Sequence, residues 1–135
     1  MTQILLIGTD LPLLEGLAQT FASLGFTPIV AQSISEGREI ATVTPPLVAL
    51  ISRALVMTGT DALSVPLAPG GALMLYRSVT GSSGPLAHAV QRNVLADLTL
   101  PLERNRLVAL VQRVDERARA TGRTGTDSSH HAPPA

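Results

Sequence analysis

Side chains that could carry out chemistry are few and far apart in this sequence. The chain has no Cys and no Trp, and all ten of its basic residues are Arg. Thiol catalysis, disulfide bonds, Cys-ligated metal centres and Lys nucleophiles are therefore excluded. No nucleophile stands at a useful spacing from a base, and no two carboxylates have the spacing of an acid–base pair. We expect a protein that is not an enzyme.

Three polar residues, Asp10, Ser52 and Tyr76, follow or end short apolar runs that are typical of buried parallel strands. Ligands of open α/β sheets bind at the carboxyl ends of the strands, so these side chains could form one small polar pocket. The loop at 81–84, with Gly at both ends, could present backbone N–H groups to a phosphate. The plainer interpretation, which we prefer, is a set of leftover polar residues and a surface loop.

The three histidines do not have the spacing of a metal site. His88 falls on a short predicted helix, and His130 and His131 lie near the C-terminus. A metal needs three or four converging ligands, and no His, Asp or Glu cluster offers them. We expect no metal and no cofactor.

Composition also bears on partners and location. The formal net charge is +0, with two Phe and one Tyr, so nothing points to nucleic acid. No apolar run approaches the ~18 residues of a membrane-spanning helix, and the first residues lack the features of a signal peptide. We expect a cytoplasmic protein that does not bind membranes.

Five apolar runs alternate with segments of helical periodicity. The runs predict strands over residues 3–7, 27–31, 47–51, 72–76 and 94–99. Helices are predicted from a cap at Thr9 or Asp10 to about residue 24, and over about 33–42, 86–92 and 103–118, with only short helical turns between 52 and 70. This alternation predicts a single α/β domain, a doubly wound five-stranded parallel sheet with helices on both faces. The stretch from Gly122 lacks apolar anchors, so we expect a domain over 1–121 and a disordered tail over 122–135.

The order of these pieces resembles the receiver domain of two-component response regulators, which has a flavodoxin-like (CheY-like) fold. Residues 4–7 resemble the first strand of the family and residues 46–50 the third. Residues 97–102 are similar to its fifth strand, which ends in Lys-Pro and precedes a helix. The resemblance covers roughly residues 3–118.

The sequence departs from the family where phosphorylation would occur. The two acidic residues that hold Mg²⁺ in receivers correspond to Gly8 and Thr9, with Asp10 just beyond them. The Asp that accepts the phosphoryl group corresponds to Ile51 or to Ser52. A single carboxylate is a poor cage for Mg²⁺.

Two further positions of the family's site are also changed. The Thr or Ser that ends the fourth strand corresponds to Tyr76 or Ser78, and the Lys before the proline corresponds to Leu100. Phosphoryl transfer concentrates negative charge that Mg²⁺ and a cation must neutralise. The resemblance therefore implies a pseudo-receiver. The Leu100–Pro101 bond could be cis, as in the family, or trans.

The last predicted helix indicates a partner surface. Arg106, Arg113 and Arg117 recur along one edge of its apolar stripe, and residues 53–123 hold nine Arg against five acids. In receivers the fourth helix, fifth strand and fifth helix form the usual partner or dimer face, which here adds Leu98 and Leu110. A solvated helix face is the alternative.

We therefore expect a stand-alone pseudo-receiver signalling module that binds a protein partner, or itself, without aspartyl phosphorylation. The alternative is a small-molecule or nucleotide sensor that uses the carboxyl edge of the sheet.

Overall fold

A computed structural model describes residues 2–56, 60–79 and 86–131, with side chains as far as residue 120. Five strands form one parallel sheet in the order β2-β1-β3-β4-β5. The strands are β1 (Gln3–Ile7), β2 (Thr27–Ala31), β3 (Val48–Ser52), β4 (Ala72–Ser78) and β5 (Val94–Leu100). The helices are α1 (Leu11–Ser23), α2 (Ile34–Val43), α3 (Arg53–Val56), α4 (His88–Asn93) and α5 (Arg104–His131), with a 3₁₀ turn, η1 (Asp61–Ser64). The predicted doubly wound parallel sheet is confirmed.

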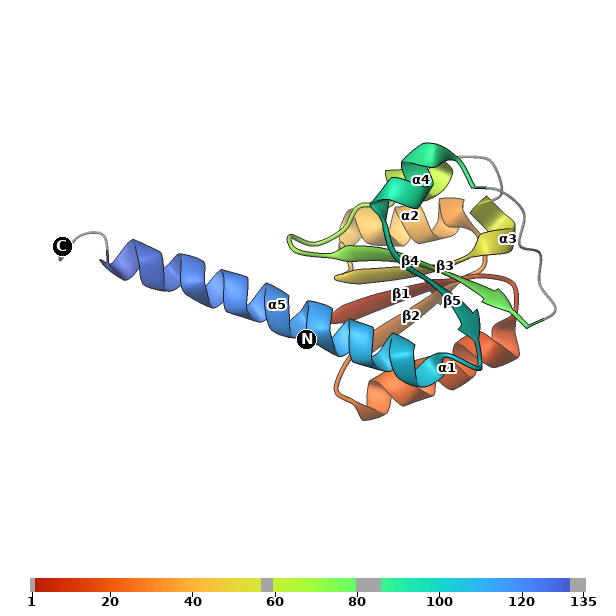
Figure 1. The fold of residues 1–135 in the computed structure, drawn as a ribbon, viewed down its shortest axis with the longest axis horizontal. Helices are drawn as coiled ribbons and strands as arrows, with labels where there is room; N and C mark the ends of the chain where they lie inside the picture. Colours follow the sequence, from red (N-terminus) through yellow and green to blue (C-terminus); the bar gives the residue numbers. More distant parts are fainter. Residues whose placement is uncertain (1, 57–59, 80–85, 132–135) are drawn as a thin grey trace.

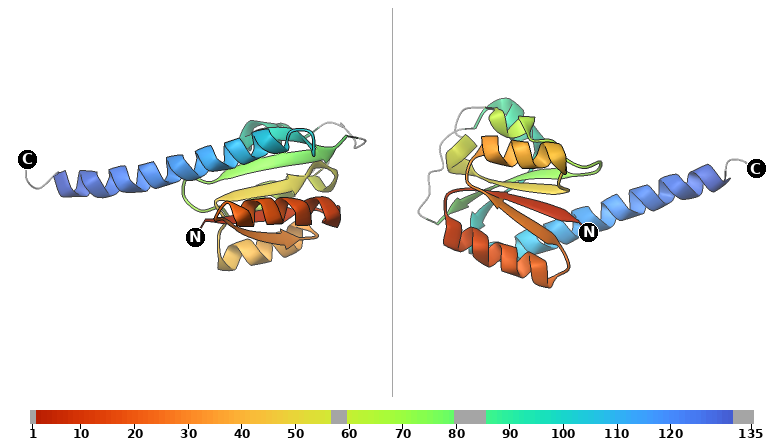
Figure 2. Two further views of the ribbon diagram at one scale, coloured as in Figure 1. Left: turned by 90° about the horizontal axis from the view of Figure 1, so that it is seen from below. Right: turned by 180° about the vertical axis from the view of Figure 1, so that it is seen from behind.

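The helices cover both faces of the sheet (Figure 1). In Figure 1, α1 and α5 lie below the sheet, whereas α2, α3 and α4 lie above it. Seen from below, α1 and α5 lie across the near face, and the last part of α5 projects beyond the sheet (Figure 2). Because successive strand residues point to opposite faces, Ile4 and Leu6 of β1 enter the core under α1 and α5. Leu5 and Ile7 enter the core under α2, α3 and α4.

Local signals in the sequence account for several element ends. The Ser33 side chain caps α2 by accepting a hydrogen bond from the Glu36 backbone N–H at 3.0 Å. Pro12 stands in the first turn of α1, where its missing N–H costs nothing. Gly25, which follows α1, has a φ of +92°, a conformation that favours glycine.

The last helix is longer than predicted. The backbone of α5 stays helical to His131, beyond the predicted end near residue 118. The division into a domain over 1–121 and a disordered tail over 122–135 stays a prediction. The prediction ended the helix where apolar residues end, but those residues decide packing and not backbone hydrogen bonding. No proline interrupts the chain between Pro101 and Pro133, so nothing breaks the helix sterically before that point.

Other elements differ mainly at their ends. β4 and β5 each run further toward their carboxyl ends than predicted, and α4 is shorter. The unclear region 52–70 contains α3 and η1. In the described part of the chain, no helix combines the length and the apolar character needed to cross a bilayer.

Candidate functional site

The carboxyl ends of β1, β3 and β4 bring three of the predicted site residues together. Ser52 and Tyr76 are register partners in the pair of β3 with β4, and Gly8 directly follows β1. A Cβ placed on Gly8 would collide with the Tyr76 hydroxyl oxygen, Oη, and would lie 3.3 Å from the Ser52 Cβ. The positions that match the family's magnesium and acceptor residues are therefore adjacent, and the Tyr76 side chain lies between them.

Ser52, and not Ile51, faces this site. The Ile51 side chain is fully buried in the core under α2, α3 and α4. Ser52 is the last residue of β3, is half-buried, and has its Cβ close to Gly8. The residue at the acceptor position thus offers a hydroxyl and no carboxylate.

Tyr76 is held as a neutral phenol. Its side chain is only 2% exposed and packs in the core with α1 and α5. Burial raises the pKa of Tyr76 above its usual value and the charge of Asp10 adds to this effect, while the nearby Ser52 hydroxyl opposes it. Among the described residues Tyr76 Oη has no hydrogen-bond partner of normal geometry. A buried polar atom without a well-formed hydrogen bond is unfavourable, so burial of the Tyr76 hydroxyl lowers the stability of the folded domain.

The remaining acidic group of the predicted site is exposed. Thr9 and Asp10 lie on the surface, and the Asp10 side chain makes no capping hydrogen bond to α1. No group of three or more His, Cys, Asp or Glu residues that could hold a metal occurs within the described ranges. Within those ranges Asp10 therefore belongs to no set of three ligands that could hold a metal ion.

The last two strands supply no cation at the position of the family's Lys. Leu100 is fully buried in the core, opposite the half-buried Ser78 in the β4–β5 pair. The Leu100–Pro101 bond is cis, one of the two alternatives left open by the sequence, and Pro101 is exposed. A buried leucine here cannot supply the positive charge that the family's Lys would bring to a phosphoryl group.

An ion pair that sequence analysis did not find links this region to the edge of the sheet. Arg53, the first residue of α3, pairs through Nη1 with Oδ2 of Asp97 on β5. Their side chains are 14% and 34% exposed. The sequence feature that could have indicated this pair was the single acidic residue, Asp97, in the predicted strand. Its partner Arg53 lies 44 residues away in the sequence. The pair spans β4, which lies between β3 and β5.

A second contact fixes the turn between β5 and α5. The Thr99 backbone N–H donates to Oε2 of Glu103 at 2.6 Å, and the Glu103 backbone N–H donates back to the Thr99 carbonyl at 2.8 Å. Arg106 adds a hydrogen bond to Glu103 Oε1 at 2.9 Å. These donors lower the pKa of Glu103, the Thr99 N–H most strongly.

One residue of the predicted partner surface is wrong, and the rest of that surface stays a prediction. Leu98 is fully buried, because alternate residues of β5 point inward, so it is a core residue and cannot contact a partner. Leu110 is half-buried. Arg106, Arg113 and Arg117 are exposed on α5, and Arg106 is paired with Glu103.

The structure adds no support for a phosphate site at the loop 81–84 or for a function of the three histidines. The loop at 81–84 lies outside the described residues. His88 is exposed on α4, and the side chains of His130 and His131 are likewise not described.

Comparisons with known proteins identify the fold. No protein-family model matches the sequence, and neither does any curated protein. A response regulator receiver domain protein from Clostridium thermocellum matches with a TM-score of 0.67 and 15% identity, over 90% of this chain and 99% of its own. A CheY-like receiver domain protein from Methanospirillum hungatei matches with a TM-score of 0.65 and 17% identity, over 89% and 98%. A signal receiver domain from Vibrio parahaemolyticus matches with a TM-score of 0.70 and 13% identity, over 91% and 96%.

These structural neighbours define the class of fold. The chain is a single α/β domain with the flavodoxin-like architecture of CheY-like receiver domains. At these identities the likeness concerns the fold, and what the domain does depends on the residues at its site.

Proposed function

We propose that this domain is a pseudo-receiver, a signalling module that acts through protein–protein contacts and without aspartyl phosphorylation. One observation carries the proposal: the Tyr76 side chain fills the space next to Gly8 in which a receiver would hold an acidic side chain. Because the side chain is buried and neutral, the site has neither the room nor the charge to hold a divalent cation.

The residues around Tyr76 agree with this proposal. A phosphoryl group on Ser52 would form a stable ester and not the labile acyl phosphate that an aspartate gives. The position of the family's Lys is the buried Leu100. Leu100 therefore supplies no positive charge to a phosphoryl group at this site.

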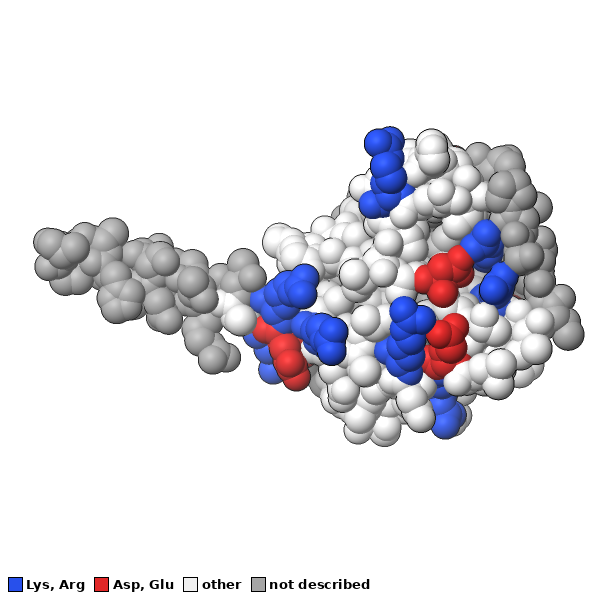
Figure 3. All heavy atoms as spheres, in the orientation of Figure 1, with Lys and Arg blue, Asp and Glu red and all other residues white. Residues whose placement is uncertain are grey.

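The face made by α4, β5 and α5 supports a role in protein binding. Leu95 on the edge strand is 50% exposed and Leu102 is 75% exposed, and both flank the exposed arginines of α5. Figure 3 shows basic side chains at several places on this side of the molecule. Apolar contact area bordered by arginine suits a partner with acidic side chains, and a second copy of this chain is the other candidate. We place this interaction in the cytoplasm, as the composition suggests.

The first test is phosphoryl uptake. The protein is incubated with acetyl phosphate and Mg²⁺, and its intact mass is measured, with a receiver domain that retains its acidic residues as the positive control. We expect no mass increase for this chain under conditions that phosphorylate the control. Uptake of a phosphoryl group that is lost at alkaline pH, as acyl phosphates are, would overturn the proposal.

The second test concerns the partner face. Sedimentation of the purified protein shows whether it self-associates, and affinity capture shows which proteins it binds. Arg113→Glu should weaken the association, whereas Arg38→Glu, on α2 at the opposite face, should not. Equal effects of the two variants would exclude the α5 face as the binding surface.

A further inference from the structure

A cavity of about 540 Å³ opens at the amino-terminal edge of the sheet, away from the Gly8–Tyr76 site. Its walls come from the starts of β4 and β5, the end of α4, the middle of α5 and the segment around η1. The volume lies within the ~300–1,000 Å³ typical of small-molecule sites. None of the sequence-based site predictions except Arg117 falls in this region.

The cavity lining combines apolar side chains with polar groups. Val65 and Leu73 are almost fully buried in its wall, and Leu95 is half exposed beside them. Asn93 adds a polar side chain, and among the described residues Arg92 and Arg117 are the charged ones that line the cavity. A cavity that combines apolar walls with a few polar groups is typical of sites that bind small organic molecules.

The two arginines are available to a ligand. Among the described residues, neither Arg92 nor Arg117 forms an ion pair, and both are exposed. The nearest acid of α5 whose contacts are known, Asp115, accepts a hydrogen bond from Thr2 at 2.6 Å and pairs with Arg119 at 3.2 Å. Among the described residues that line the cavity, none carries a carboxylate that could pair with these guanidinium groups.

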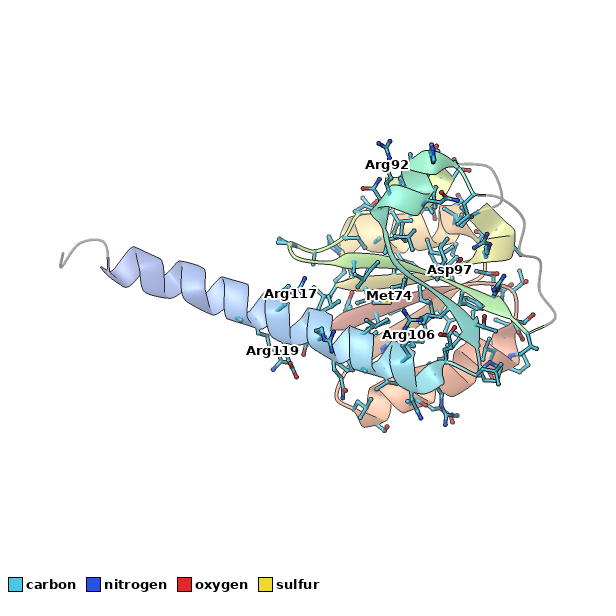
Figure 4. The ribbon with its side chains drawn as sticks, viewed as in Figure 1. Met74, Arg92, Asp97, Arg106, Arg117 and Arg119 are labelled. Atoms are coloured by element: carbon cyan, nitrogen blue, oxygen red, sulfur yellow. The ribbon has the colours of Figure 1, made fainter. Side chains whose placement is uncertain are left out.

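The positions of Arg92 and Arg117 in the fold agree with their being available to a ligand. In Figure 4, Arg92 stands on α4 and Arg117 on α5, on opposite sides of the ends of β4 and β5 that face the amino-terminal edge. Figure 3, in the same orientation, shows mostly uncharged surface between the basic side chains of α4 and those of α5. The apolar surface is thus bordered by positive charge on two sides.

We propose that this cavity binds a small organic anion that has an apolar body and one carboxylate. The apolar body would gain about 25 cal/mol for each Å² of its surface that Val65, Leu73 and Leu95 remove from water. The carboxylate would pair with one or both guanidinium groups, whose planar donors match its two oxygens. Because the cavity borders α4, β5 and α5, the ligand would occupy part of the proposed partner face. The proposal does not depend on whether that face binds a protein.

Octanoate is the probe, and its uncharged analogue octanamide is the matched control. Each is titrated into isotope-labelled protein, and amide chemical shifts are followed by NMR. Octanoate should shift the amides of Gly70, Gly71 and Leu95 most strongly and should bind at least about fivefold more tightly than octanamide. Equal affinities for octanoate and octanamide would overturn the proposal that the ligand is an anion. Chemical-shift changes that spread over the whole surface, or no changes at all, would overturn the proposal that octanoate binds in this cavity.

Variants separate the cavity from the rest of the basic surface. Arg92→Gln and Arg117→Gln should each weaken octanoate binding about threefold to fivefold, whereas Arg104→Gln, which is exposed on α5 but does not line the cavity, should not. Leu95→Glu should abolish binding by placing a negative charge beside the ligand, and Leu24→Glu, also at an exposed leucine, should leave it unchanged. A loss of binding in the two control variants as large as in the cavity variants would overturn the proposal.

Discussion

The Tyr76 hydroxyl oxygen, Oη, lies too close to the position of a Cβ on Gly8 for both atoms to keep their places. A side chain at position 8 would therefore displace the end of the Tyr76 side chain. Because protein interiors are densely packed, a tyrosine at position 76 disfavours any residue larger than glycine at position 8.

Gly8→Ala should destabilise the domain by about 1–3 kcal/mol, because the added Cβ meets Oη and displaces the tyrosine from its packing. In the background of Tyr76→Phe, which removes only the oxygen, the same substitution should cost about 1 kcal/mol less. Urea unfolding of the four proteins measures this coupling.

Gly16→Ala is the control for that experiment. Nothing lies within 4 Å of a Cβ at this position, which is exposed in the middle of α1. Here alanine should stabilise the protein by up to about 1 kcal/mol, since glycine is the poorer helix former. If the effects of Gly8→Ala and Tyr76→Phe on the free energy of unfolding were additive, the side chains at positions 8 and 76 would not compete for the same space.

Titration of the phenol tests the burial of Tyr76 directly. It is the only Tyr, and there is no Trp, so phenolate absorbance reports this side chain alone. The pKa should lie above its usual value of 10.0 in the folded protein and return to that value in urea. Asp10→Asn should lower the midpoint in the folded protein, because the negative charge of Asp10 raises it.

The sign of the linked stability follows from the direction of that shift. A group whose folded pKa is raised contributes stability that is present below its unfolded pKa and is lost as the pH rises through its folded pKa. Stability should therefore fall with alkalinity above about pH 10, and less so in Tyr76→Phe. An unshifted midpoint in the folded protein would mean that water reaches the hydroxyl.

Removing one member of the Arg53–Asp97 pair should destabilise the domain. Asp97→Asn leaves the mostly buried Arg53 without this carboxylate, and we expect a cost of about 1–2 kcal/mol. A double-mutant cycle with Arg53→Gln should give a coupling of about 1 kcal/mol in urea unfolding. Arg106→Gln, which breaks a more exposed pair with Glu103, should cost less than Asp97→Asn. Zero coupling between positions 53 and 97 would refute a stabilising role for the pair.

Glu103→Gln should remove a pH-dependent part of the stability. The pKa of Glu103 is lowered from its ordinary 4.5, first by the Thr99 N–H. The contribution of Glu103 to the free energy of unfolding is therefore present above the pKa of the unfolded state. It is lost as the pH falls through the lower pKa of the folded state. Unfolding midpoints of the two proteins should differ at neutral pH and converge in acid. Glu116→Gln, exposed on α5, serves as the control, and a difference that persists at the lowest pH would contradict this mechanism.

Several features could be predicted from the sequence because they depend on local pattern. The continuous apolar runs of β1 and β3 indicated strands buried on both faces, and the spacing from Ser33 to Glu36 predicted the start of α2. The resemblance to receivers predicted which positions would meet at the carboxyl edge. It left Ile51 and Ser52 as alternatives, because a one-residue shift in a strand reverses the face of every side chain.

Other features depend on contacts between distant residues. The partner of Asp97 could not be predicted, because Arg53 reaches it only when β3, β4 and β5 are aligned. Leu98 was assigned to the surface from its place in the sequence, but the pleat of β5 turns it into the core. The length of α5 was missed because the loss of apolar residues signals the end of packing and not the end of a helix.

The sequence by itself thus determined the class of fold and the chemistries that are absent, because strand and helix periodicity and residue types are properties of the chain. Only the tertiary structure decided which side chains meet at the carboxyl ends of the strands, in the site beside Gly8. Which of Tyr76 and Ser78 enters it, and which atom meets Gly8, depend on the register of β3 with β4 and on the space left between side chains. Those quantities exist only once the strands have packed together.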